Sequence, residues 1–170
     1  MLWVADFTSV RTAVSFVYVA FIMDVFARYI VGWKVSSSPN AQRVLDALDQ
    51  ALAARNPDPD TLMHHSDRGV QYLASKYTER LEEAKIDPSG GSVGDSYDNA
   101  MAETINRLYK SEVIEHEGPW QGQNDVEIAT LNWGQWFNSD RRFGPIGYIA
   151  PAQAERNCYD TLIPVTLAAE

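Results

Sequence analysis

The sequence contains very few of the residues that build disulfides or zinc sites. Among its 170 residues are one cysteine, Cys158, and three histidines. One cysteine cannot form an internal disulfide, and no Cys/His zinc spacing can be assembled from this set. Any metal site in this protein must therefore be built mainly from oxygen ligands.

Long apolar runs are also missing. The longest, Phe16 to Met23, is far too short to span a bilayer, and Asp6 and Arg11 exclude a secretory signal near the start. We therefore expect a soluble, cytoplasmic protein without a membrane partner. The hydrophobic content of 45% nevertheless suffices for one packed globular domain.

Basic residues are outnumbered by acidic ones. The chain has 14 Lys and Arg against 23 Asp and Glu, a net charge of -9. This balance argues against a protein that holds nucleic acid by its overall surface field, because Lys and Arg dominate phosphate binding. The argument weakens if some acids form a metal site and if DNA-binding segments lie outside this chain.

The order of apolar segments predicts a layered α/β domain. Segments rich in Val, Ile, Phe, Tyr and Trp predict strands over 2–10, 15–23, 28–35, 61–64 and 86–88, the second covered on both faces. Helical periodicity predicts helices over 40–56, 73–84, 98–116 and 124–138, with Asn124 and Glu127 at capping-box spacing. A Gly/Ser-rich hinge is expected over 89–96. Gly and Pro residues predict a mostly irregular chain from Asp140 onward.

Three acids stand out by position. Asp6 lies inside the first strand, Asp67 directly follows the fourth, and Glu103 lies in the helix after the hinge. Each also has an ordinary explanation. Asp6 could be a charge that faces solvent, Asp67 a turn residue, and Glu103 a residue on the solvent-exposed face of its helix. Together, carboxylates from two strands and one helix suit Mg²⁺, and two such ions about 4 Å apart serve phosphodiester chemistry.

Basic residues share the helix face of Glu103. At roughly 100° per residue, Arg107 lies about 40° and Lys110 about 20° around the helix axis from Glu103. These cations either support the acid as neighbours on the helix or contact DNA phosphate beside the metals.

Three blocks of the sequence resemble the catalytic blocks of insertion-sequence transposases related to retroviral integrases. The 35 residues between Asp67 and Glu103 match the spacing of that family. A further segment is similar to the family's second and third strands. The segments concerned are Trp3–Thr8, His64–Tyr72, Asp95–Glu103 and Phe21–Trp33.

The resemblance implies a ribonuclease-H-like fold, a mixed five-stranded sheet flanked by helices. Residues 1–155 would form the catalytic core and 156–170 an irregular tail. Asp6, Asp67 and Glu103 would be the metal-binding catalytic triad of a DDE polynucleotidyl transferase, with Mg²⁺, or Mn²⁺ as substitute, and two ions once DNA is bound. Hydrolysis at the element's end would be followed by attack of the freed 3′-hydroxyl on another strand.

Further residues are candidates for DNA contact. Lys110 matches the family's basic residue seven positions after the glutamate, and Arg107 accompanies it. His65 and Asn99 are substrate-positioning candidates, with local hydrogen bonding or capping as the alternative. Arg141, paired with Arg142, offers phosphate contact or is simply solvated.

Other conspicuous residues receive structural interpretations. Asp24 is interpreted as a turn residue. The aromatic residues Trp133, Trp136 and Phe137 are interpreted as core, with stacking on frayed bases as the alternative.

The implied partners are transposon-end DNA and target DNA, handled by a homo-oligomer on the bacterial nucleoid. A DNA-binding segment absent from this chain is expected to be required. The rival functions are a ribonuclease-H-like nuclease that only hydrolyses, and a non-catalytic remnant that serves as a dimerisation or regulatory module. The hinge predicts that the Glu103 helix closes onto the metals only when DNA is bound.

Overall fold

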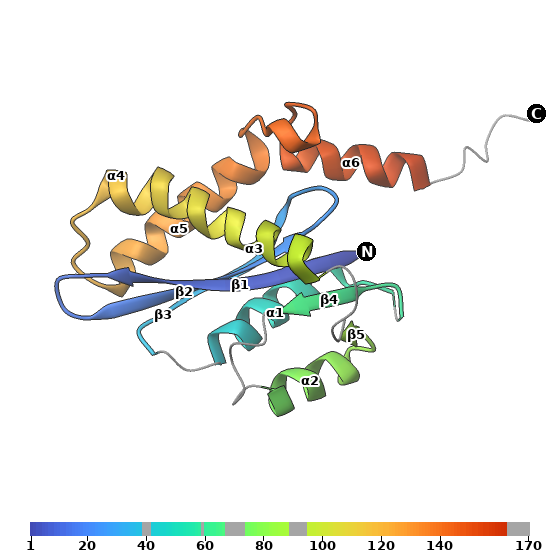
Figure 1. Cartoon of the computed structure of the whole chain (residues 1–170), viewed down its shortest axis with the longest axis horizontal. Helices are drawn as coiled ribbons and strands as arrows, with labels where there is room; N and C mark the ends of the chain where they lie inside the picture. Colours follow the sequence, from blue (N-terminus) through green and yellow to red (C-terminus); the bar gives the residue numbers. More distant parts are fainter. Residues whose placement is uncertain (39–41, 59, 67–73, 89–94, 163–170) are drawn as a thin grey trace, which may run out of the picture.

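The computed structural model describes residues 1–38, 42–58, 60–66, 74–88 and 95–162, which form a mixed α/β fold (Figure 1). One five-stranded sheet has the order β3-β2-β1-β4-β5. The first three strands are an antiparallel meander, and β4 and β5 continue the sheet parallel to β1. The predicted mixed five-stranded sheet is confirmed. The strands are β1 (Leu2–Arg11), β2 (Phe16–Asp24), β3 (Ile30–Ser36), β4 (Met63–Ser66) and β5 (Asp87–Pro88).

Helices cover both faces of the sheet (Figure 1). The helices α3 and α5 pack on one face, and α1 and α2 pack on the other. No helix among the described residues combines the length and apolar character needed to cross a membrane. The helical elements are α1 (Gln42–Arg55), α2 (Ala74–Glu83), α3 (Asp95–Tyr109), the π-helical η1 (Lys110–Ile114), α4 (Glu115–Glu117), α5 (Gln123–Ser139), the 3₁₀ turn η2 (Gly144–Ile146) and α6 (Pro151–Leu162).

Strand β2 lies in both cores. Val19 and Phe21 belong to the core under α3 and α5, whereas Ala20 and Ile22 belong to the core over α1 and α2. Successive side chains of a strand point to opposite faces, so a strand covered on both sides is apolar at every position. The predicted double coverage is confirmed for the central part of this strand, from Val19 to Ile22, whereas Phe16 at its start is exposed.

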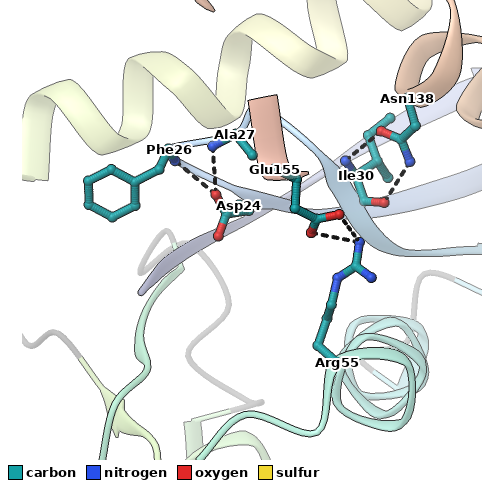
Figure 2. Close-up of polar contacts among 7 residues, drawn as sticks. All are labelled: Asp24, Phe26, Ala27, Ile30, Arg55, Asn138 and Glu155. Atoms are coloured by element: carbon teal, nitrogen blue, oxygen red, sulfur yellow. Dashed lines mark hydrogen bonds and ion pairs between the residues drawn. The ribbon is translucent and has the colours of Figure 1, made fainter. Parts of the chain in front are cut away.

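The turn between β2 and β3 depends on Asp24 (Figure 2). Its Oδ1 accepts the backbone N–H groups of Phe26 and Ala27 at 2.9 and 2.8 Å. Such a side-chain-to-backbone turn is a common use of Asp, and the structural interpretation of this residue is confirmed.

The outer edge of β3 is covered by amide side chains rather than by another strand. Asn138 of α5 pairs with both peptide groups of Ile30, at 2.9 and 3.0 Å (Figure 2). Gln50 of α1 accepts the N–H of Trp33 at 2.7 Å. Gln123 of α5 accepts the N–H of Ser37 and donates to the Val35 carbonyl, at 3.0 and 3.4 Å. Three amides thereby satisfy five backbone groups of the edge.

Helix α1 approaches β3 closely at Gly32. A Cβ built on this glycine would lie 2.3 Å from the carbonyl oxygen of Ala47 and 3.0 Å from the Cβ of Ala51. The absence of a side chain therefore lets the helix backbone lie directly on the strand.

We expect Gly32→Ala to lower the free energy of unfolding by about 1–3 kcal/mol, because the added methyl group overpacks this contact. Urea unfolding measures the loss. The matched control is Gly134→Ala in α5, where a Cβ would meet only Trp33 Nε1 at 4.0 Å, so better helix propensity should stabilise the protein. Equal stability of wild type and Gly32→Ala would contradict this account of the packing.

The predicted irregular chain after Asp140 is wrong over most of its described length. The residues from Pro151 to Leu162 form α6, which begins with proline at its first position, where the missing N–H breaks no helical bond. Arg55 of α1 meets Glu155 of α6 at 2.8 Å (Figure 2). Burial raises the pKa of the Glu155 carboxyl despite the nearby guanidinium. The division of the chain after residue 155 stays a prediction.

Helix starts also differ from the sequence-based predictions. Helix α3 begins at Asp95, three residues before the predicted start at residue 98. It continues into the π-helical η1 at Lys110. The predicted capping box is wrong, because Gly122 is the N-cap of α5 and no side chain caps it. Asp125 instead accepts the N–H of Gln121 at 3.0 Å.

Candidate active site

Asp6 lies one residue beyond the described pairing of β1 with its parallel neighbour β4. Among the described residues, the pairing between β1 and β4 runs as far as Ala5 with Ser66. The half-buried Asp6 carboxylate accepts two hydrogen bonds, from its neighbour's N–H (Phe7, 2.8 Å) and from the side-chain amide of Asn106 (2.7 Å). The Asp6 carboxylate is thus held by a local partner, the Phe7 N–H, and by a long-range partner, the Asn106 amide.

The long-range partner brings α3 to this point of the sheet. Asn106 is three residues after Glu103, which is nearly one helical turn. Glu103 is exposed on that helix, adjacent to the turn that contacts Asp6. The structure therefore places the first and third predicted acids in one region of the molecule.

The second predicted acid, Asp67, lies outside the described residues. Its chain neighbour Ser66 pairs with Ala5, and Ala5 directly precedes Asp6. Within the described ranges, no three His, Cys, Asp or Glu side chains gather closely enough to hold a metal ion. The hinge residues 89–94 are also outside these ranges, so the predicted closure of the Glu103 helix stays a prediction.

Asn106 was missed by the sequence reasoning. It is buried, and its Oδ1 has no hydrogen-bond partner among the described residues. Buried amide oxygens are generally paired, so this one can accept a bond from water or bind a cation. With the carboxylates of Asp6 and Glu103, the site offers only oxygen donors, the ligands that Mg²⁺ prefers. The donor set thus fits a hard divalent cation. No local sequence pattern marks Asn106 as a functional residue.

Strand β4 is tied down just before Asp67. His64 is buried and shares a hydrogen bond with the hydroxyl of Tyr77 in α2. Burial is the main reason why the pKa of His64 falls to about 4, and burial raises the pKa of Tyr77. The next residue, the candidate His65, is also buried. The end of β4 is therefore packed firmly against α2.

The two basic candidates on α3 and η1 are exposed. Arg107 and Lys110 make no ion pair with any residue in the described part of the chain. Lys110 is the first residue of the π-helical segment, a distortion that often occurs at functional sites. The side chain of the candidate Asn99 is outside the described set.

The alternative that Arg141 is simply solvated is wrong. Its guanidinium pairs with Glu112 of η1 and lies over the rings of Phe137 and Phe143, 5.4 Å from each centroid. Glu112 also accepts the indole N–H of Trp133 at 2.9 Å. This arginine is engaged inside the protein, so its contact with DNA stays a prediction without structural support.

The aromatic residues of α5 divide between core and surface. Trp133 and Phe137 are buried, as predicted, within a cluster that includes Phe21 and Tyr109. Trp136 is 45% exposed, and the prediction that it is core is wrong.

Comparison with known families identifies the family of this chain. Two family models, both described as integrase core domain, match residues 1–96 and 84–151. This chain belongs to the integrase core family. The matched residues include Asp6 of β1, Asp67 and Glu103 of α3, and polynucleotidyl transfer is the general activity of this family.

Similar proteins of the integrase core family include transposases. The chain is 55% identical to the transposase for insertion sequence element IS629 of Shigella sonnei, over 99% of this chain and 56% of that protein. It is 48% identical to the putative transposase for IS986/IS6110 of Mycobacterium tuberculosis strain H37Rv, over 93% of this chain and 58% of that protein. This integrase core chain thus spans little more than half the length of these relatives.

Solved structures agree on the fold. A chain of the simian T-cell lymphotropic virus intasome in complex with the PP2A regulatory subunit B56 gamma superposes with a TM-score of 0.71 at 12% identity, over 99% of this chain and 56% of that chain. The HTLV-2 integrase catalytic core in complex with magnesium gives 0.61 at 15% identity, over 90% and 94%. The predicted ribonuclease-H-like fold is confirmed.

Proposed function

We propose that this chain is the catalytic core of an insertion-sequence transposase, a DDE polynucleotidyl transferase that cleaves DNA at transposon ends and joins it to target DNA. The observation that carries the proposal is the hydrogen bond between Asn106 and Asp6, which joins the helix of Glu103 to the strand of Asp6. The identity to transposases over nearly the whole chain supports the same function.

In this proposal Asp6, Asp67 and Glu103 hold Mg²⁺, or Mn²⁺ in its place, with two ions once DNA is bound. The metal would supply positive charge that stabilises the negative charge developing on the reacting phosphate. Asn106 and the N–H of Phe7 fix the Asp6 carboxylate before any ligand arrives. Pre-orientation of this kind lowers the cost of assembling a reactive geometry.

Cations beside the acids would receive the DNA. Arg107 and Lys110 are exposed and follow Glu103 along the same helical run. Their charges would contact backbone phosphates, which position a strand without reading its sequence. His65 and Asn99 remain proposed positioning residues.

Partners are proposed on the same grounds. Transposon-end and target DNA are the substrates expected from the transposase relatives, and a homo-oligomer is expected from the trimeric and dimeric forms named for the HTLV-2 integrase core. We further propose that a DNA-binding segment outside this chain contributes to end recognition and that the protein acts in the bacterial cytoplasm.

Titration with Mg²⁺ and Mn²⁺ tests the proposed site through thermal stability. A cation that binds only the folded state must raise the melting temperature. At 100 times the dissociation constant, the wild type should gain about 2.7 kcal/mol, and Asp67→Asn should gain much less. Lys76→Ala, on the exposed surface of α2, is the control and should respond like the wild type. An equal response of wild type and Asp67→Asn would contradict the proposed ligand set.

Asn106→Ala is expected to lower the strand-cleavage rate, or the apparent affinity for Mg²⁺, by about 10–100-fold, as is usual when a residue that orients a ligand is lost. The decisive readout is the Mg²⁺ concentration at half-maximal rate, which should rise. Thr104→Ala, an exposed change on the same helix, is the control. A lower rate at an unchanged Mg²⁺ midpoint, accompanied by a lower melting temperature, would assign Asn106 a structural role only.

A further inference from the structure

One face of the sheet is left open at the β1–β2 hairpin. Helices α1 and α2 cover this face around Trp3, Ala5, Ala20 and Ile22. Toward the hairpin tip no helix of the described residues covers this side, whereas α3, α4 and α5 cover the opposite side (Figure 1). On the open side, Phe7 is 39% and Phe16 53% exposed.

Strand register sets the side chains of this face in three transverse rows. Directly opposed residues of antiparallel strands point to the same face, and Val10, Val17 and Val19 point into the α3–α5 core. The remaining positions therefore form the open surface, which we call the hairpin platform. Its rows are Phe7 and Lys34, with the buried Ala20 between them; Ser9, Tyr18 and Ser36; and Arg11 and Phe16.

The platform combines rings and cations without any acid. Phe7, Tyr18 and Phe16 are diagonal or alternate neighbours, roughly 7 Å apart by strand geometry. Arg11 and Lys34 flank them at opposite corners. Exposed rings with interspersed cations form a surface on which the bases of a single strand stack while its phosphates are neutralised.

Charge along the chain sets this region apart. Between Phe7 and Leu45 there are four basic residues and one acidic residue, whereas the whole chain carries a net charge of -9. The single acid of that stretch, Asp24, lies at the far end of β2 and is used in a turn. Of the four basic residues, Arg11 and Lys34 lie on the platform, so they give it a local positive charge that attracts a polyanion, whereas the net charge of the chain repels it.

The hairpin is held rigidly. Thr12 closes the tip, since its N–H donates to the Ser15 carbonyl at 2.9 Å and its Oγ1 accepts the N–H of Ser15 at 3.2 Å. The N–H of Ala13 donates to the carbonyl of Trp120 at 2.8 Å, which anchors the tip to the chain between α4 and α5. A pre-formed surface loses little freedom when it binds.

We propose that the hairpin platform binds a single strand of DNA and holds it next to the cleavage site. The platform begins at Phe7, the residue directly after Asp6. A DNA strand bound on the platform therefore passes the edge of β1 close to the Asp6 carboxylate on its way to or from the cleavage site. This inference rests on the proposed function and adds a strand-binding surface separate from Arg107 and Lys110 on the opposite side of the sheet.

Binding is measured by fluorescence anisotropy of a labelled oligonucleotide without divalent metal, so that cleavage is not required. Arg11→Ala/Lys34→Ala should weaken single-strand binding and lower the slope of log affinity against log salt by roughly 0.7 for each cation removed. The charge-matched control is Lys76→Ala/Arg156→Ala, which removes two exposed cations from α2 and α6. Equal salt slopes in the two double variants would overturn the proposal.

The rings are tested separately. Phe16→Ala should weaken single-strand binding by about 5-fold to 100-fold, the usual effect of losing one stacking ring, with a much smaller effect on duplex binding. Phe26→Ala removes a ring that is 64% exposed, against 53% for Phe16, from the β2–β3 turn and is the control. Photocrosslinking with iodouracil DNA should map to Phe7, Phe16 or Tyr18, and crosslinks confined to other surfaces would contradict the platform.

Two further outcomes separate this inference from the proposed function. If Asp6→Asn binds single strands as the wild type does and the platform variants do not, the platform stands whatever the cleavage assays show. If the platform variants change the molar mass measured by light scattering and leave DNA binding unchanged, the face is an interface between copies of this chain and the proposal fails.

Discussion

Asp6→Asn and Glu103→Gln are each expected to lower the rate of Mg²⁺-dependent DNA cleavage by roughly 10³-fold or more. The estimate follows from the several kcal/mol by which a metal stabilises transition-state charge, at about 1.4 kcal/mol for each tenfold change in rate. Both substitutions keep the shape of the side chain and remove its negative charge. The Asp6 variant should also keep its contact with Asn106 in a changed hydrogen-bond pattern.

The assay uses oligonucleotides that carry transposon ends and follows cleavage and strand joining separately. Glu115→Gln is the control, because this glutamate is exposed in the same helical run and has no proposed role. Unchanged cleavage in either acid variant would remove that residue from the proposed triad. Cleavage without joining by the wild type would favour a nuclease that only hydrolyses.

Acidification from pH 6.5 to pH 4 is expected to cost about 3 kcal/mol of folding stability through His64 alone, at 1.36 kcal/mol for each pH unit. The folded protein keeps this buried imidazole neutral until the pH approaches about 4, whereas the unfolded chain protonates it near pH 6.5. The unfolded state therefore binds more protons throughout this window. Stability falls as the pH falls, and the contribution of His64 stops changing below about pH 4.

Urea unfolding at several pH values measures this dependence, and His64→Gln should make the stability curve shallower between pH 4 and 6.5. His116→Gln, at an exposed position of α4, is the control and should leave the slope unchanged. The NMR signal of the His64 ring gives the midpoint directly. A midpoint near 6.5 would show that the ring is not kept neutral by burial, and the prediction would then be wrong.

The parts of the fold that depend on local patterns were predictable from the sequence. The apolar segments predicted β1, β2 and β3, because β-branched and aromatic residues favour a pleated sheet that other elements cover. The placement of Asp6 in a strand and Glu103 in a helix followed from the same patterns. The spacing of the three acids then allowed a resemblance that the family comparison bears out.

The parts that depend on tertiary contacts were not predictable. The contact of Asn106 with Asp6 joins residues one hundred positions apart, and nothing local distinguishes this asparagine from a solvated one. The pairing of Arg141 with Glu112 is equally remote from any local pattern. Pro151 illustrates a local ambiguity, because proline breaks a helix from within and begins one equally well.

The amide-covered edge of β3 restricts how copies of this protein can associate. Strand addition at that edge would first have to displace Asn138, Gln50 and Gln123 from the peptide groups that they satisfy. At the other end of the sheet, β5 is two residues long and contains a proline. Both margins therefore resist templated growth into fibrils. Multimers of this protein should therefore form through contacts between side chains and not through backbone pairing of strands, and such contacts give assemblies of finite size.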